Sequence, residues 1–149
     1  MRLLLVSNST GPDGNYLDWC ENELTTFLGA GAHVLFVPFA GVDEGAYGKT
    51  AVDRLALMDV TAEWADRSDD FGAALGRATA VFIGGGNTFL LLDRLARSGM
   101  LAASSRVASS GPSSMLLADP TTATHRSRGM VVASRIAPRA HGARMSHSS

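Results

Sequence analysis

The stretch Val-Phe-Ile-Gly-Gly-Gly-Asn-Thr-Phe at residues 81–89 decides the fold class of this chain. An apolar run typical of a buried strand ends in three glycines, which let the backbone turn sharply and approach a ligand because no Cβ stands in the way. Asn87 and Thr88 follow at the position of a helix cap, before leucines at helical spacing. The stretch therefore predicts a strand, a tight turn and a helix whose first amides face the turn. Such a turn either binds an anion or simply connects two elements, and the local sequence favours neither alternative.

Apolar runs and helical spacings alternate along the first two thirds of the chain. The run at residues 2–7 shows no period-two alternation, which predicts a parallel strand buried on both faces. The alternation predicts an α/β fold with a mostly parallel sheet, whose ligands lie beyond the carboxyl ends of the strands. The pattern predicts strands at 2–7, 33–38, 60–62 and 78–83, and helices at 15–28, 48–58, 71–75 and 87–97, with one more beginning at 101.

Two polar strand ends, residues 7–10 and 84–88, are expected to open on the same rim of the sheet. Short polar side chains after the first strand, Ser9 among them, can bind a substrate, although such residues also cap turns. Elsewhere, His33 is expected to be an ordinary surface or edge histidine at the start of its strand. Trp64 is expected to pack against the sheet edge.

Composition restricts the class of protein. A chain of 149 residues with 46% hydrophobic content can bury one core, and its length indicates a single domain. No apolar run reaches the ~18 residues of a membrane span, and the apolar N-terminal run meets polar residues too early for a signal peptide. These features indicate a soluble cytoplasmic protein without a membrane partner. Cys20, the only cysteine, is expected to be a buried structural thiol, which excludes a disulfide framework and a cysteine zinc cluster.

Charge and composition change together near residue 108. Residues 1–107 carry eight Lys and Arg against 13 Asp and Glu, and residues 108–149 carry five against one, so the two parts have net charges of −5 and +4. The basic residues of the second part are scattered among Ser and Ala, with no aromatic side chain after Phe89 to stack on a base. We therefore expect an α/β domain over 1–107 and a poorly ordered tail over 108–149, with no nucleic-acid partner.

Three segments in order resemble peptidase E, the aspartyl dipeptidases of the S51 serine peptidase family. They are Leu-Leu-Leu-Val-Ser-Asn-Ser-Thr at 3–10, Val-Pro-Phe-Ala-Gly-Val at 37–42 and Phe-Ile-Gly-Gly-Gly-Asn-Thr-Phe-Leu-Leu at 82–91. The resemblance covers about residues 1–107. It implies a flavodoxin-like or class I amidotransferase-like three-layer α/β sandwich and the hydrolysis of dipeptides with an N-terminal aspartate, without a cofactor.

The resemblance also implies an active site. In this family a serine on a Gly-x-Ser-x-Gly elbow attacks the peptide carbonyl, a downstream histidine is the general base, and backbone amides hold the oxyanion. By resemblance, Gly85 and Gly86 are the oxyanion-hole candidates. Asn87 and Thr88 would support the turn and contact the substrate, together with Ser9.

The chain departs from the family pattern where the nucleophile should follow. No Gly-x-Ser-x-Gly segment is present, and Ser113 and Ser114 lack glycines in the required register. A triad of Ser114 and Asp119 with one of the tail histidines cannot be assigned without geometry. The catalytic residues therefore stay unknown. The tail histidines are His125, His141 and His147. They also lack the spacing of a zinc site, so we expect no metal.

The simultaneous change near residue 108 suggests an altered reading frame or an equivalent loss of the family's C-terminal part. A truncated sheet exposes an apolar edge and face, so we expect self-association. Two functions remain open, namely a serine dipeptidase that is inactive or impaired and a non-catalytic α/β remnant that binds or interacts. Dinucleotide binding fits poorly, because the glycines do not have GxGxxG spacing and follow a late strand.

Overall fold

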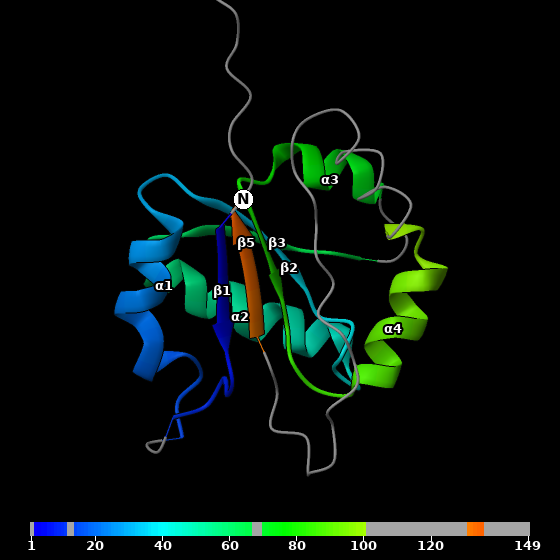
Figure 1. Ribbon diagram of the computed structural model, residues 1–149, viewed down its shortest axis with the longest axis horizontal. Helices are drawn as coiled ribbons and strands as arrows, with labels where there is room; N and C mark the ends of the chain where they lie inside the picture. Colours follow the sequence, from blue (N-terminus) through cyan, green and yellow to red (C-terminus); the bar gives the residue numbers. More distant parts are fainter. Residues whose placement is uncertain (1, 12–13, 67–69, 101–130, 136–149) are drawn as a thin grey trace, which may run out of the picture.

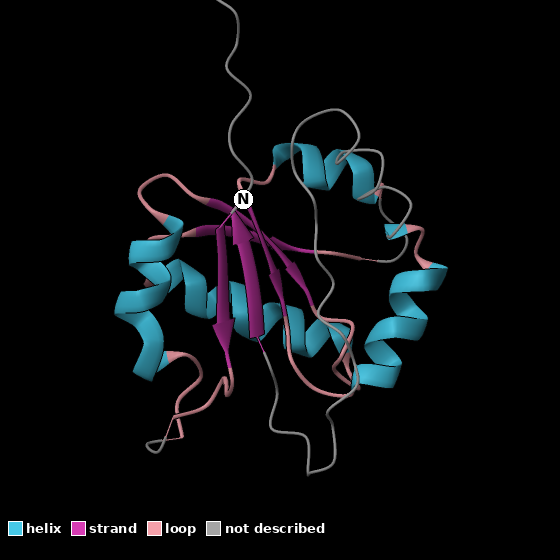
Figure 2. Cartoon of the chain, in the orientation of Figure 1, coloured by secondary structure: helices cyan, strands magenta, loops and turns pink. Residues whose placement is uncertain are grey.

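The computed structural model describes residues 2–11, 14–66, 70–100 and 131–135, and these form a sheet with helices on both sides (Figures 1 and 2). The elements follow in the order β1 (Arg2–Val6), η1 (Asp18–Cys20), α1 (Glu21–Leu28), β2 (His33–Val37), α2 (Glu44–Leu57), β3 (Thr61–Trp64), α3 (Phe71–Arg77), β4 (Ala80–Ile83), α4 (Thr88–Arg97) and β5 (Val131–Arg135).

The five strands lie in the order β1-β5-β4-β2-β3. Strand β2 pairs in parallel with β3 and β4, whereas β5 is antiparallel to both β1 and β4. Strands β1 to β4 therefore all run the same way, which confirms the prediction of a mostly parallel sheet. Val6 pairs with Val131 and Ile83 with Val132, so β1 and β4 end at the same edge, as predicted.

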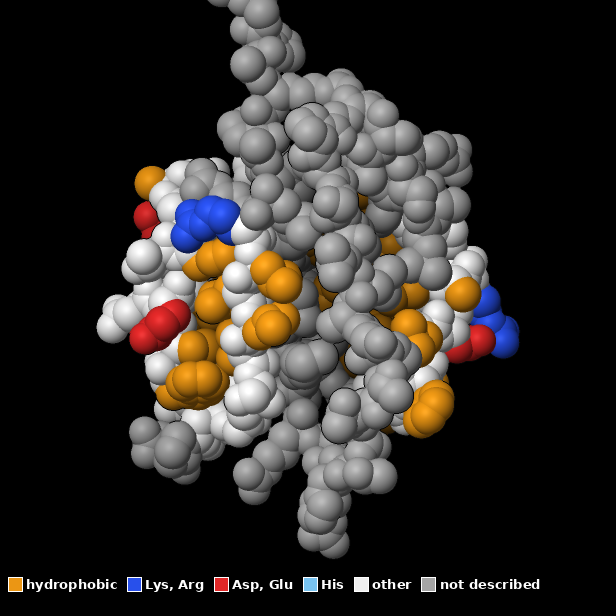
Figure 3. Space-filling view, in the orientation of Figure 1, with side chains coloured by type: hydrophobic (Ala, Val, Ile, Leu, Met, Phe, Trp, Pro, Cys, Tyr) orange, Lys and Arg blue, Asp and Glu red, His pale blue; other side chains and the backbone are white. Residues whose placement is uncertain are grey.

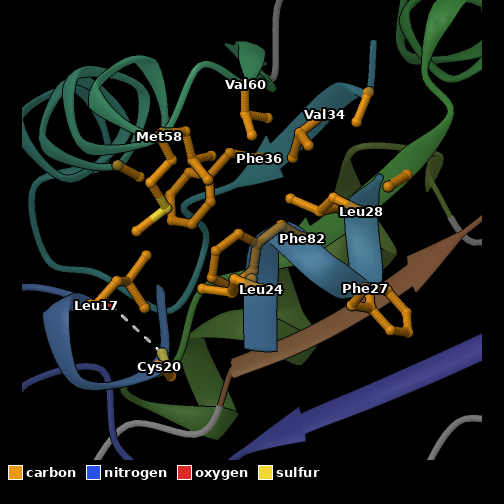
Figure 4. Close-up of a cluster of buried hydrophobic side chains, with 14 of the residues drawn as sticks. Leu17, Cys20, Leu24, Phe27, Leu28, Val34, Phe36, Met58, Val60 and Phe82 are labelled. Carbon is orange, nitrogen blue, oxygen red and sulfur yellow. Dashed lines mark hydrogen bonds between the residues drawn. The ribbon is translucent and has the colours of Figure 1, made fainter. Parts of the chain in front are cut away.

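Each face of the sheet is covered by its own helices. On one face, Phe36 and Phe82 of the central strands pack with α1, α2 and the loop residue Leu17 (Figure 4). On the other, Leu35 and Val37 pack with α3 and α4. Phe36 and Phe82 are fully buried and meet edge to face, with ring centroids 5.3 Å apart. Successive side chains of each strand thus point to opposite faces of the sheet, and helices cover both faces. This produces the three-layer sandwich that the resemblance implies.

Two predicted helices differ from those observed. Helix α2 begins at Glu44, earlier than predicted, because the Asp43 carboxylate accepts the Ala46 N–H at 2.9 Å and caps it. The helix predicted over 15–28 is divided into η1 and α1. No helix of the described ranges is long and apolar enough to cross a membrane.

The prediction that β1 is buried on both faces is wrong. Val6 is buried, but Leu3 and Leu5 are 50% and 57% exposed. Helices α3 and α4 pack over β2 and β4 on that side of the sheet, and the cluster that they form with these strands does not include Leu3 or Leu5. Figure 3 shows hydrophobic side chains at the surface around the position of β1. The chain thus has an apolar surface at one end of its sheet.

The segment after residue 107 is described only at residues 131–135. These form β5, which lies between β1 and β4 and was not predicted from the sequence. The predicted domain boundary, the helix expected from residue 101, Ser113, Ser114, Asp119 and the tail histidines lie outside the described residues.

Two helical glycines predict opposite effects of the same substitution. Gly76→Ala in α3 adds a Cβ with no heavy atom within 4 Å, so helix propensity should raise the free energy of unfolding by about 0.5–1 kcal/mol. Gly48→Ala in α2 places a Cβ 2.5 Å from Trp64 Cγ. Because Trp64 must then move, stability should fall by about 1–3 kcal/mol. Urea unfolding followed by circular dichroism measures both; equal effects would contradict the packing of α2 on β3.

Candidate functional site at the glycine turn

The turn between β4 and α4 is bonded to the segment that follows β2. The Gly84 N–H donates to the Val37 carbonyl at 3.0 Å, and the Asn87 N–H donates to the Ala40 carbonyl at 3.0 Å. Segments 37–42 and 82–91, two of the three that carry the resemblance, are therefore in direct contact at the carboxyl ends of neighbouring parallel strands. This is the edge at which open α/β sheets bind ligands.

Glycine is required at two positions of the turn by close contacts. A Cβ on Gly84 would lie 2.7 Å from Phe36 Cζ and 2.8 Å from Tyr47 Oη. Gly86 has a φ of +144°, and a Cβ there would lie 2.5 Å from the Ala40 carbonyl oxygen. Both positions therefore exclude any side chain for packing reasons, whether or not a ligand binds.

The amides of the turn differ in what they contact. Those of Gly84 and Asn87 bond to backbone carbonyls, and that of Gly85 lies close enough to the Tyr47 hydroxyl to lower its pKa. Within the described ranges, no acceptor is found for the Gly86 N–H. Gly86 is half-buried, and Asn87 and Thr88 are exposed. Of the two oxyanion-hole candidates, Gly86 thus has the available amide.

Asn87 caps α4 as the sequence predicts. Its Oδ1 accepts the N–H of Phe89 at 3.0 Å and that of Leu90 at 3.2 Å. Thr88 is the first residue of α4, and no cap bond from its side chain is found in the described part. The positive end of the α4 dipole lies beside Gly86, which favours negative charge there.

Arg94 of α4 holds the segment after β2 against the helix, a role that the sequence analysis missed. Its Nη1 donates to the Phe39 carbonyl at 2.8 Å and also to the Gly41 carbonyl, and its Nε lies 3.1 Å from Glu44 Oε1. The Arg94 and Glu44 side chains are only 15% and 18% exposed. Since α4 directly follows the glycine turn, this contact fixes both sides of the site together.

Ser9 lies at the other polar strand end. The Ser9 carbonyl accepts the Leu17 N–H at 2.7 Å, and Asn8 bonds to the backbone of Thr10 at 2.6 Å and 3.3 Å. Strand β5 separates β1 from β4, so at about 4.8 Å per strand their ends are roughly 10 Å apart. The structure therefore brings Gly85, Gly86, Asn87 and Thr88 together and leaves Ser9 two strands away on the same edge.

Two partly buried tyrosines lie behind the turn. Burial raises the pKa of Tyr16, and the nearby Tyr47 raises it further. Burial also raises the pKa of Tyr47, although Tyr16 and the Gly85 amide partly offset the effect. Their rings meet edge to face with centroids 6.2 Å apart. Both phenols are thus held protonated.

The described residues place no histidine at this edge. His33 is the one histidine within them; it begins β2, at the opposite end from the turn, and its Nε2 lies 3.7 Å from Glu63 Oε1. Its side chain is 28% exposed, which agrees with the prediction of an ordinary surface or edge histidine. Cys20 is buried as predicted, and burial raises the pKa of its thiol. A hollow of about 310 Å³ between β3 and α3, lined by Trp64, Asp70 and Phe71 among others, includes no residue of the turn.

The fold and the turn define a class: an α/β protein that presents backbone amides at the carboxyl edge of a parallel sheet. The family model of peptidase family S51 matches residues 3–112, and the chain belongs to this family. Peptidase E of Streptomyces coelicolor is 41% identical over 100 residues, which are 67% of this chain and 41% of that protein. Peptidase E of Salmonella typhimurium is 36% identical over 104 residues, 68% of this chain and 45% of that protein.

A solved structure from Listeria monocytogenes EGD-e, provisionally named a peptidase E protein, has the same fold. It aligns with a TM-score of 0.50 at 21% identity, over 74% of this chain and 55% of the Listeria chain. The present chain spans less than half of the length of the curated relatives named above. The resemblance inferred from the three segments is thereby confirmed.

Removing the α4 cap gives a testable prediction. Asn87→Ala leaves the Phe89 and Leu90 amides without an acceptor, so the free energy of unfolding should fall by about 1 kcal/mol. Asn87→Asp keeps an acceptor oxygen and adds negative charge at the helix N-terminus, so it should retain most of the stability. Chemical denaturation of both variants measures the difference. Equal losses in the free energy of unfolding would show that Asn87 does not stabilise the protein through its side-chain bonds to these amides.

The two tyrosines predict a loss of stability at alkaline pH. A tyrosine in the unfolded chain ionises near its ordinary pKa of 10.0, whereas the folded protein keeps both phenols protonated to higher pH. Their contribution is therefore fully present below about pH 10 and is lost as the pH rises toward the folded pKa, by up to about 1.4 kcal/mol per pH unit for each group. Urea unfolding at a series of pH values should show a shallower slope in Tyr16→Phe and in Tyr47→Phe. An identical slope in both variants and the wild type would contradict this.

Proposed function

We propose that this chain is a serine dipeptidase of the peptidase E type, acting in the cytoplasm on dipeptides with an N-terminal aspartate. The observation that carries the proposal is the Gly86 amide, which lacks an acceptor within the described ranges and lies in a turn fixed to two neighbouring elements. Membership of family S51 supplies the reaction class, and the names of the relatives indicate a peptide substrate.

The geometry of the turn supports the following assignment of roles. The carbonyl oxygen of the scissile amide accepts a hydrogen bond from the Gly86 N–H, and the N-terminal end of α4 stabilises the charge that develops on it. Asn87 holds the helix end in place and Thr88 lies exposed beside it. Ser9, two strands away, binds a more distant part of the substrate. The reaction needs a nucleophile and a general base but no cofactor.

A second candidate is a non-catalytic binding or interaction module. Two observations favour it: no Gly-x-Ser-x-Gly segment occurs in the 149 residues, and Leu3 and Leu5 are half exposed at the sheet edge. Such a module binds acidic peptides at the turn without cleaving them and self-associates through its apolar surface.

Incubation with Asp-Leu and Ala-Leu separates the two candidates. If the dipeptidase proposal is right, leucine should be released from Asp-Leu and not from Ala-Leu, as measured by chromatography of the free amino acid. No release from protein with a folded circular-dichroism spectrum would reject the dipeptidase and leave the module. Sedimentation velocity on the same sample should then show an oligomer, because the module is proposed to self-associate.

A serine-directed phosphonofluoridate serves as the control for any activity that is found. Hydrolysis by this chain should be abolished in parallel with a single mass increase, and peptide mapping of the product would identify the nucleophile. Activity that survives the reagent would point to a contaminating peptidase or to another mechanism.

A further inference from the structure

Tyr47 occupies the space between the two halves of the candidate site. A Cβ on Gly41, in the segment after β2, would lie 2.7 Å from Tyr47 Cδ1. A Cβ on Gly84, at the end of β4, would lie 2.8 Å from Tyr47 Cε1 and 2.8 Å from its hydroxyl oxygen. The ring of Tyr47 therefore fills the volume that these two glycines leave empty, one on each side of the junction.

The ring is itself held in place by other aromatic side chains. The ring of Phe36 in β2 meets it edge to face, with ring centroids 5.1 Å apart. The ring of Tyr16 also meets it edge to face, with ring centroids 6.2 Å apart. Tyr47 also lies in the first turn of α2, which the Asp43 cap fixes. The position of the phenol is thus determined by packing and does not depend on its hydroxyl.

The hydroxyl lies where it can decide which amide of the turn is available. Its oxygen would lie 2.8 Å from a Cβ on Gly84, and the neighbouring Gly85 amide lowers the pKa of Tyr47. The Gly84 and Asn87 amides are bonded to the Val37 and Ala40 carbonyls. If the Tyr47 hydroxyl accepts the Gly85 N–H, then Gly86 is the glycine of the turn whose amide can donate to a substrate.

We propose that Tyr47 is a positioning residue for the glycine turn: its ring spaces the turn from the segment after β2, and its hydroxyl binds the Gly85 amide so that Gly86 provides the oxyanion donor. The inference rests on the proposed function for the meaning of the Gly86 amide. The contact between Tyr47 and Gly85 can be tested without any turnover.

Amide hydrogen exchange of the full chain, measured by NMR on wild type, Tyr47→Phe and Tyr16→Phe, tests the proposal. Tyr47→Phe keeps the ring and removes the hydroxyl, so exchange at Gly85 should accelerate roughly tenfold relative to Gly84 and Asn87, whose carbonyl acceptors remain. Tyr16→Phe removes the neighbouring hydroxyl but leaves that of Tyr47 in place, so Gly85 should stay protected. Unchanged exchange at Gly85 in Tyr47→Phe, or equal acceleration at all three amides, would overturn the positioning role.

A titration of the same samples with the ketomethylene isostere of Asp-Leu, which keeps the carbonyl but has no amide bond to cleave, separates this proposal from the proposed function. In the wild type the Gly86 amide resonance should shift on binding, and in Tyr47→Phe the apparent affinity should fall by about threefold or more. If Gly86 does not shift even in the wild type while the exchange result holds, the dipeptide function fails and the Tyr47 contact stands. If Gly86 shifts equally in both proteins, the Tyr47 hydroxyl does not position the donor and the further inference fails.

Discussion

The close approach of two backbone segments, the turn after β4 and the stretch after β2, governs the arrangement of the whole rim. A Cβ on Gly86 would come within 2.5 Å of the Ala40 carbonyl oxygen, so the two segments can pack at this distance only if residue 86 is glycine. The approach then permits the Asn87 N–H to reach Ala40 and Arg94 to reach Phe39. Helix α4 consequently begins at a fixed place, with its positive end beside the turn.

Local signals account for what the sequence predicted, and contacts between distant residues account for what it missed. The glycines of 84–86 and the Asn87 cap act within a few residues, so their pattern predicts the turn and the helix start. Tyr47 and Arg94 take their roles from partners on other elements, such as Gly84 and Gly41, which no local pattern reveals. Strand β5 was missed for the same reason, since its short apolar run pairs only with distant strands.

The error at β1 has a related origin. A continuous apolar run is typical of a strand covered on both faces, and the central strand β2 meets this expectation because α1 and α2 cover one face and α3 and α4 the other. The run of β1 is equally apolar, but the strand is at the end of the sheet and its Leu3 and Leu5 are half exposed. An apolar run shows that a strand can be buried on both faces, and the position of the strand in the sheet determines whether both faces are covered.

The count of available amides limits the chemistry that the described part can perform alone. Acyl transfer uses preorganised donors on the developing oxyanion, and loss of one donor costs about 10²–10³ in kcat. Of the three turn glycines, Gly84 donates its amide to the Val37 carbonyl and Gly85 lies beside the Tyr47 hydroxyl, so Gly86 is the remaining donor in the described ranges. In the general arrangement a second donor follows the nucleophile on its elbow. A turn with one donor can orient and polarise a carbonyl, while efficient cleavage requires the second donor and the attacking group to come from elsewhere in the chain.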